Sequence, residues 1–168
     1  MYQVGDFVVK VNNGVCRVED IVELDGMSDV KGRKYYLMVP REDKNARLYV
    51  PVEGKNNNIR NVMSEDEAMA FIKRIPDIAV AWIESDKMRE QEYKAAIRSG
   101  SPEQLVSIIK NIYRRNQERS EQGKKNTTID ERYYKQAENI LYSELAFALG
   151  REKSEIIDLI SETFSARN

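Results

Sequence analysis

Alternating apolar and polar positions predict a small β domain in residues 1–62. Apolar runs with a period near two lie at 7–11, 14–23, 34–39 and 47–52, and 59–62 adds a short fifth run. The dipeptide Asp25-Gly26 is a turn signal, and the residues from there to Gly32 are expected to form a loop or a long hairpin tip. Another loop is expected at 56–58. Five short strands in this length are typical of a strongly bent barrel of the SH3 or Tudor kind.

From Ser64 onward the apolar positions follow the period of amphipathic helices. Ser64-Glu65-Asp66-Glu67 is a capping-box pattern, and Pro76 is expected to end the helix that follows it. The segment 77–100 is interpreted as a second helix that carries Trp82 and stops at Gly100. Capping residues predict three more helix starts, at Ser101-Pro102, Thr128 and Ser154, and glycines predict stops at Gly123 and Gly150.

The apolar stripes of the last three helices predict the core of the helical part. Their members are Leu105, Ile108, Ile109 and Ile112, then Tyr133, Ala137, Ile140, Leu141, Leu145 and Ala148, and finally Ile156, Ile157, Ile160 and Phe164. The pattern therefore predicts an α+β protein. Residues 1–62 form a small Tudor- or SH3-like β-barrel, and residues 63–168 form an all-helical domain of about five helices.

Overall charge does not indicate a partner for this chain. It has 27 basic and 28 acidic residues, so the net charge is −1 and only local clusters can carry an electrostatic argument. Its hydrophobic content of 41% is ordinary for a globular protein. The sequence shows neither a run long enough to span a bilayer nor a leader-like N-terminus. We therefore expect a cytoplasmic protein with no membrane partner.

The chemistry-bearing residue types argue against an enzyme. The chain has no histidine, the commonest general base and metal ligand, and no nucleotide-binding or nucleophile-elbow motif. Cys16 is the single cysteine, so an intramolecular disulfide is excluded and a zinc site is disfavoured. Because Cys16 lies in an alternating apolar run, it is expected to be an inert, buried thiol. No cofactor is expected.

A basic cluster between residues 107 and 125 is one candidate for contact with phosphates. Its members are Lys110, Arg114, Arg115, Arg119, Lys124 and Lys125, against the two acids Glu118 and Glu121. On a helical wheel Lys110 and Arg114 lie opposite the Leu105/Ile109 stripe. The alternative interpretation is a solvated helix face with a basic C-terminal turn, which the helix dipole favours in any case.

Trp82, the only tryptophan, is the second candidate. If 77–100 is helical, Trp82, Arg89 and Tyr93 share one face at spacings i, i+7 and i+11. An aromatic side chain beside an arginine suits a DNA groove, where the ring can wedge between bases and the guanidinium can contact a phosphate. The alternative is that Trp82 and Tyr93 pack against the barrel or a neighbouring helix.

Several short motifs, in this order, resemble the CarD/CdnL family of bacterial transcription regulators. They are Tyr2–Val9 with Gly14, Tyr49-Val50-Pro51-Val52, Asn58–Val62, Trp82, Tyr93-Lys94-Ala95 before Ser99-Gly100, Tyr113–Arg119, and Asp130-Glu131-Arg132 with Ala137, Leu141 and Glu144-Leu145-Ala146. Each motif is weakly specific by itself, but together they extend over essentially the whole chain.

The resemblance implies a non-enzymatic regulator in two parts. The N-terminal Tudor-like domain, related to the polymerase-interacting domain of the transcription-repair coupling factor, would bind the β subunit of RNA polymerase. The helical domain would contact promoter DNA, largely without sequence specificity, at the upstream edge of the transcription bubble. A tryptophan of this domain wedges into the minor groove and slows bubble collapse, a role that falls on Trp82. A monomer, associated with the nucleoid through the polymerase, is expected.

The chain departs from the family pattern at the expected contact positions. Family members often place two arginines directly after the tryptophan, whereas here 83–92 separate Trp82 from Tyr93, which makes Arg89 a candidate and not a transferred residue. Where an arginine is common before Val-Pro the chain has Tyr49, so Arg47 and Tyr49 are the candidates for polymerase contact. Strand addition at an exposed barrel edge would need few specific side chains. The rival hypothesis is a protein-interaction adaptor whose helices serve only as a scaffold.

Overall fold

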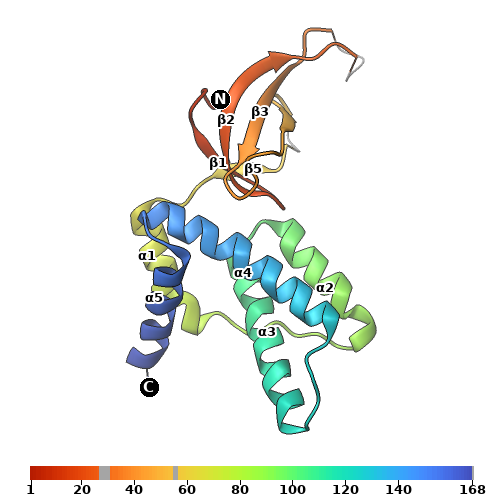
Figure 1. Cartoon of the computed structure of the whole chain (residues 1–168), viewed down its shortest axis with the longest axis vertical. Helices are drawn as coiled ribbons and strands as arrows, with labels where there is room; N and C mark the ends of the chain where they lie inside the picture. The colour runs from red at the N-terminus through yellow and green to blue at the C-terminus, as the bar shows by residue number, and fades with distance from the viewer. Residues whose placement is uncertain (27–30, 55–56, 168) are drawn as a thin grey trace. The chain divides into compact units, whose positions relative to one another are not determined.

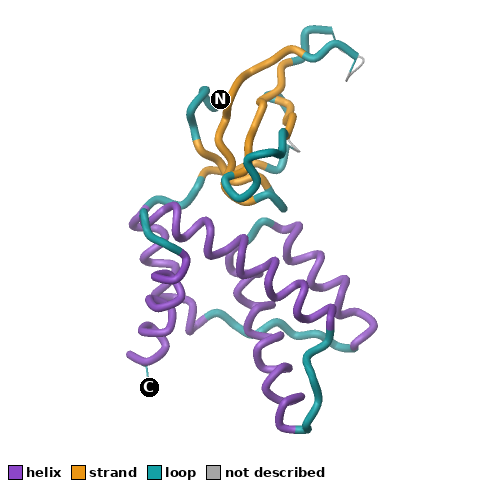
Figure 2. Tube along the Cα trace, in the orientation of Figure 1, coloured by secondary structure: helices purple, strands orange, loops and turns teal. Residues whose placement is uncertain are grey.

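The computed structural model describes residues 1–26, 31–54 and 57–167. The chain divides into two compact units, Met1–Val62 and Met63–Asn168, the first built of strands and the second of helices (Figures 1 and 2). Part of the loop predicted after Asp25, at 27–30, lies outside the described residues, as does Asn56 of the loop predicted at 56–58.

The first unit is a five-stranded antiparallel half-barrel, so the α+β, Tudor-like prediction is confirmed. Its strands are β1 (Phe7–Lys10), β2 (Gly14–Glu23), β3 (Lys34–Pro40), β4 (Leu48–Pro51) and β5 (Ile59–Asn61), in the sheet order β4-β3-β2-β1-β5. The β1–β2 turn uses a left-handed Asn12 with φ 74°, a conformation that asparagine tolerates better than most residues. Among the described residues, β4 and β5 are the two edges of the sheet.

A β-bulge explains the imperfect alternation of β2. Val18 pairs with Met38 and Asp20 with Leu37, so Glu19 is an extra residue that shifts the register. The half-barrel core consists of Val8, Cys16, Val18, Tyr36, Met38 and Val50. Cys16 is fully buried, as predicted, and burial raises the pKa of its thiol to about 11.

The described residues of the second unit form five α-helices and one short 3-10 helix, η1. These are α1 (Glu65–Arg74), η1 (Ile75–Asp77), α2 (Asp86–Ser99), α3 (Pro102–Glu121), α4 (Thr128–Leu149) and α5 (Lys153–Ala166). Several predicted caps are confirmed: Ser64 and Ser101 accept the N–H groups of Glu67 and Gln104, and Gly100 closes α2 with φ 65°. None of the described helices combines the length and apolarity that crossing a bilayer requires.

The prediction of a helix over 77–100 is wrong in its first part, because α2 begins only at Asp86. Pro76 ends α1 through a 3-10 turn, and Ile78–Ser85 then runs as non-helical chain that joins η1 to α2. This stretch is rich in β-branched and aromatic residues, which favour extended backbone. Trp82 therefore lies in a connecting segment and not on a helix.

Two helix starts also differ from the prediction by one or two residues. Thr127, not Thr128, caps α4 by accepting the N–H of Asp130, and Glu152, not Ser154, precedes α5 in a reciprocal capping box with Glu155. In both cases the capping side chain lies three residues before an acidic residue, which is the spacing that a first helical turn requires.

The predicted helical core is confirmed at most positions and wrong at two. Leu105, Ile108, Ile112, Tyr133, Ala137, Leu141, Leu145 and Ile156 are buried, while Ile109, Ile140, Ala148 and Ile160 are half-buried against them. By contrast, Ile157 and Phe164 of α5 are 47% and 39% exposed. Helix α5 packs against α1, η1 and α4 with only part of its surface, so part of its apolar stripe stays in water.

Candidate functional site

The segment from Ile78 to Ser85 presents Trp82 to solvent. The Trp82 side chain is 87% exposed, while Ala81 and Ile83 on either side pack against the helical core. Neighbouring side chains of an extended backbone point in opposite directions. Burial of the two flanking residues therefore directs the indole outward, and the packing alternative for Trp82 does not hold within the helical unit.

Helix α3 holds this segment through hydrogen bonds to its backbone. The Ser107 hydroxyl donates to the carbonyl of Ala79 at 2.6 Å, and the N–H of Ala81 donates to the carbonyl of Ser107 at 3.1 Å. The Asn111 side-chain amide donates to the carbonyl of Ala81 at 2.9 Å. The residue that precedes Trp82 is thus bonded to α3 through both its N–H and its carbonyl, and Figure 2 shows this loop crossing the helix.

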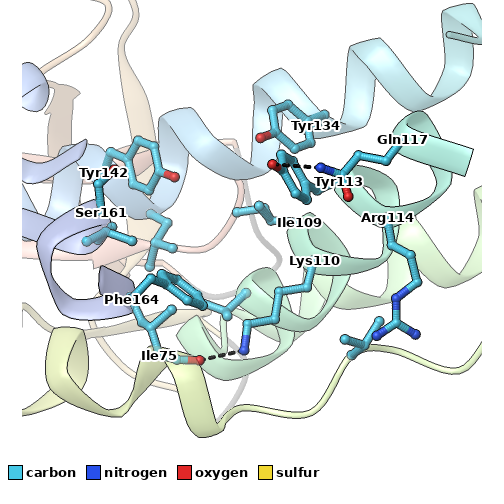
Figure 3. Close-up of a pocket in the computed structure, with 14 residues that line it drawn as sticks. Ile75, Ile109, Lys110, Tyr113, Arg114, Gln117, Tyr134, Tyr142, Ser161 and Phe164 are labelled. Carbon is cyan, nitrogen blue, oxygen red and sulfur yellow. Dashed lines mark hydrogen bonds between the residues drawn. The ribbon is translucent and has the colours of Figure 1, made fainter. Parts of the chain in front are cut away.

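Lys110, predicted to contact DNA, is engaged within the protein instead. Its ammonium donates to the carbonyls of Ile75 at 2.6 Å, Pro76 at 3.3 Å and Ile78 at 2.6 Å, and Figure 3 shows the side chain reaching Ile75. It also lies 5.6 Å from the centroid of the Phe164 ring, and burial lowers its pKa. The three N–H donors of an ammonium are therefore used by η1 and the chain that follows it.

A buried carboxylate, Asp130, lies beneath the start of α2. It is 0% exposed and accepts the Tyr93 hydroxyl and the Arg115 Nε, both at 2.7 Å. The charge of Asp130 is therefore paired and hydrogen-bonded, as a buried carboxylate requires. Asp130 lies in the first turn of α4, and the sequence alone does not reveal this pairing because its two partners lie on α2 and α3.

Two arginines connect this carboxylate to the surface. Arg89 donates to the Tyr93 hydroxyl at 3.1 Å and to the Asn111 side-chain oxygen at 2.9 Å. Asp86, at the start of α2, accepts from Arg89 at 3.2 Å and from Arg115 at 3.0 Å. The network thus joins α2, α3 and α4 around the base of the Trp82 segment.

The structure corrects the predicted DNA-contacting face of α2. Tyr93 is 0% exposed and burial raises its pKa to about 12, so it belongs to the core, as the packing alternative held. The side chains of Arg89 and Arg115 are only 15% and 21% exposed and are held by carboxylates. The helical-wheel argument was wrong because Trp82 is not on the helix, and it could not detect partners from other elements.

Arg114, Lys124 and Lys125 are the predicted DNA contacts that lie exposed with Trp82 in the helical unit. Lys124 and Lys125 occupy the α3–α4 loop, which Arg119 orders by donating to the carbonyl of Lys125 at 2.9 Å. Arg114 lies at the border of a hollow of about 710 Å³ (Figure 3). Apolar and aromatic side chains of α3, α4 and α5 line most of this hollow, among them Ile109, Tyr113, Tyr134, Tyr142 and Phe164.

The two candidate polymerase contacts lie at the β4 edge of the half-barrel. Tyr49 is 44% exposed on β4, whereas Arg47 precedes the strand and donates to the turn carbonyls of Lys44 and Ala46 at 2.8 and 3.0 Å. The expectation that Arg47 shares the strand with Tyr49 is therefore wrong. Because the N–H of Val52 donates to Lys34 of β3, the alternation of an antiparallel ladder directs the backbone groups of Tyr49 toward the open edge.

Two family models match the chain. Residues 2–63 match the CarD-like/TRCF RID domain, and residues 81–161 match the CarD C-terminal domain. The fold and these matches define a transcription factor that interacts with RNA polymerase, a class of non-enzymatic regulators. The chain belongs to the CarD family, which confirms the resemblance noted in the sequence. Comparison with curated proteins gave no match.

Proposed function

We propose that this protein binds the β subunit of RNA polymerase through Met1–Val62 and stabilises the promoter open complex through Trp82. The indole contacts the DNA at the upstream edge of the bubble and slows its closure. The observation that carries this proposal is the 87% exposure of Trp82 between two inward-facing neighbours on a tethered segment.

The energetics of such a contact are favourable. A tryptophan offers roughly 200 Å² of surface, and covering it contributes about 5 kcal/mol at ~25 cal/mol per Å². Unstacking a base step costs a few kcal/mol, which this contact can offset. Only about 1.4 kcal/mol of net stabilisation lengthens the open-complex lifetime tenfold.

Electrostatic contact with the phosphates is assigned to Arg114, Lys124 and Lys125. These are exposed cations, whereas Lys110, Arg89 and Arg115 bind other groups of the protein. Because the net charge of the chain is −1, the protein is expected to bind DNA weakly alone and without sequence preference. The protein acts as a monomer in the cytoplasm. Its binding to the polymerase brings it to promoters.

Contact with the polymerase is assigned to the open edge of β4. An added strand of the β subunit would pair with the backbone of Tyr49, which explains how the contact tolerates the loss of the family arginine. The exposed ring of Tyr49 and the guanidinium of Arg47 flank this edge. Replacement of Tyr49 by a charged residue is expected to weaken polymerase binding through charge repulsion, without unfolding the half-barrel.

A second candidate function is a protein-interaction adaptor in which the helical unit does not touch DNA. The observation that favours it is the number of cations, Lys110, Arg89 and Arg115, that are engaged in internal bonds. This adaptor would bind polymerase equally well with or without Trp82.

Open-complex lifetime on a ribosomal RNA promoter separates the two functions. The wild type is expected to lengthen the lifetime, and Trp82→Ala is expected to lose that effect while its stability changes by less than about 0.5 kcal/mol. Tyr113→Ala, which removes another exposed aromatic ring from the same unit, is the matched control and retains the effect. An unchanged lifetime with wild-type protein, despite polymerase binding, supports the adaptor, whereas full activity of Trp82→Ala rejects the wedge.

A further inference from the structure

The side chain of Asn111 forms hydrogen bonds both to the Trp82 segment and to the buried network. Its side-chain amide donates to the carbonyl of Ala81 at 2.9 Å, and its side-chain oxygen accepts from Arg89 at 2.9 Å. An amide side chain has both an NH₂ donor and an oxygen acceptor, so Asn111 can bind a backbone carbonyl and a guanidinium at the same time. The side chain is half-buried, so both bonds are partly shielded from water.

The peptide that these bonds hold is the one between Ala81 and Trp82. The carbonyl of Ala81 belongs to that peptide, so the hydrogen bond from Asn111 restricts the rotation that would swing the indole. Arg89 is itself held by Tyr93 and Asp86. Through Asn111, the backbone that carries Trp82 is therefore bonded to the packed helices α2, α3 and α4, which restrict its motion.

We propose that Asn111 is a positioning residue that keeps the Trp82 side chain pre-oriented before DNA arrives. A connecting segment without such a bond would sample many conformations, and binding would have to restrict it at the cost of conformational entropy. With the bond in place, the segment is already restricted in the free protein. The effect on open-complex lifetime rests on the proposed function, whereas the ordering of Trp82 does not.

Asn111→Asp separates the two bonds. Aspartate keeps an acceptor for Arg89 but loses the donor to the carbonyl of Ala81, and its negative charge repels that carbonyl. Asn139→Asp is the matched control, because it makes the same chemical change on the exposed face of α4, where Asn139 accepts from Lys153. Asn111→Ala, which removes both bonds and adds no charge, replaces Asn111→Asp if circular dichroism shows that the aspartate variant is unfolded.

The first readout is the fluorescence of Trp82 in the free protein. Because the chain has one tryptophan, the time-resolved anisotropy of Trp82, excited at a wavelength that tyrosine does not absorb, reports on this segment alone. Asn111→Asp is expected to increase the amplitude of the fast, local depolarisation while the melting temperature of the helices stays near that of Asn139→Asp. An unchanged anisotropy decay in a folded Asn111→Asp protein overturns the proposal.

The second readout is the open-complex lifetime with RNA polymerase. Asn111→Asp is expected to shorten the lifetime by up to about tenfold, but not below that of Trp82→Ala, and Asn139→Asp is expected to match the wild type. A wild-type lifetime for Asn111→Asp, with Trp82→Ala still impaired, shows that pre-orientation does not matter for DNA and overturns the functional part. If Trp82→Ala itself has no effect, the proposed function fails and the anisotropy alone decides the positioning role.

Discussion

Asp130→Asn tests whether the buried network, and not the apolar core alone, holds the helical unit together. The substitution preserves the size of the side chain and removes its charge. Asparagine can still accept the Tyr93 hydroxyl, but its amide nitrogen would then face the Arg115 Nε, which is also a donor. The guanidinium of Arg115 would lose its buried partner.

The structure indicates how much free energy of unfolding Asp130→Asn should lose. Asp130 is 0% exposed and both of its side-chain bonds are 2.7 Å long, so solvent does not screen the pair at this end. Removal of one partner from a buried ion pair costs about 3–5 kcal/mol. Because Arg115 is 21% exposed and also reaches Asp86, we expect the lower end of that range, about 3 kcal/mol.

The assay is urea unfolding followed by far-UV circular dichroism, whose signal comes mainly from the helical unit. Asp86→Asn is the matched control, since Asp86 accepts from the same Arg115 but its side chain is 76% exposed. Water screens exposed ion pairs and leaves them little net effect on stability, so this control is expected to unfold close to the wild type. A loss for Asp130→Asn no larger than that of Asp86→Asn would refute the argument from burial.

Two further predictions concern the thiol and the α3–α4 loop. Burial raises the pKa of Cys16 from 9.0 to about 11, so the stabilisation from the neutral thiol is complete below pH 9.0 and is lost as pH rises toward 11. A thiol reagent at about pH 8 should therefore label Cys16 only as fast as the protein unfolds, and rapid labelling of the native protein would contradict this. Replacement of both Lys124 and Lys125 by alanine removes the two proposed phosphate contacts, so the slope of log affinity for promoter DNA against log salt should decrease by about 2. An unchanged slope, measured on polymerase-bound promoter, would remove this loop from the interface.

Most of the fold is predictable from local patterns. Period-two runs locate all five strands, and serine caps with glycine stops locate α1, α3 and the end of α2, because these signals act within a few residues. The bulge at Glu19 is an exception, since the extra residue is defined only by pairing with β3. The start of α2 is another, because contacts with α3 and the core hold Ile78–Ser85 out of helix.

The candidate site is less predictable than the fold. A helical wheel places Arg115 on the flank of α3 and cannot show that Asp130, 15 residues away in the sequence, accepts its Nε. Likewise Lys110 looks like a free cation, although the carbonyl of Ile78, 32 residues away, accepts its ammonium. Long flexible side chains find partners across elements, so the identity of the exposed cations follows from packing.

By itself the sequence determined the α+β architecture, the CarD-like order of motifs and the presence of one tryptophan at the centre of the functional question. These features rest on short-range periodicity, capping and residue type. Only the tertiary structure decided that Trp82 is exposed while Tyr93 is buried, and that Asn111 joins the Trp82 segment to a buried carboxylate network. The physical reason is that exposure and hydrogen bonding depend on groups brought together from distant parts of the chain, which no local pattern encodes.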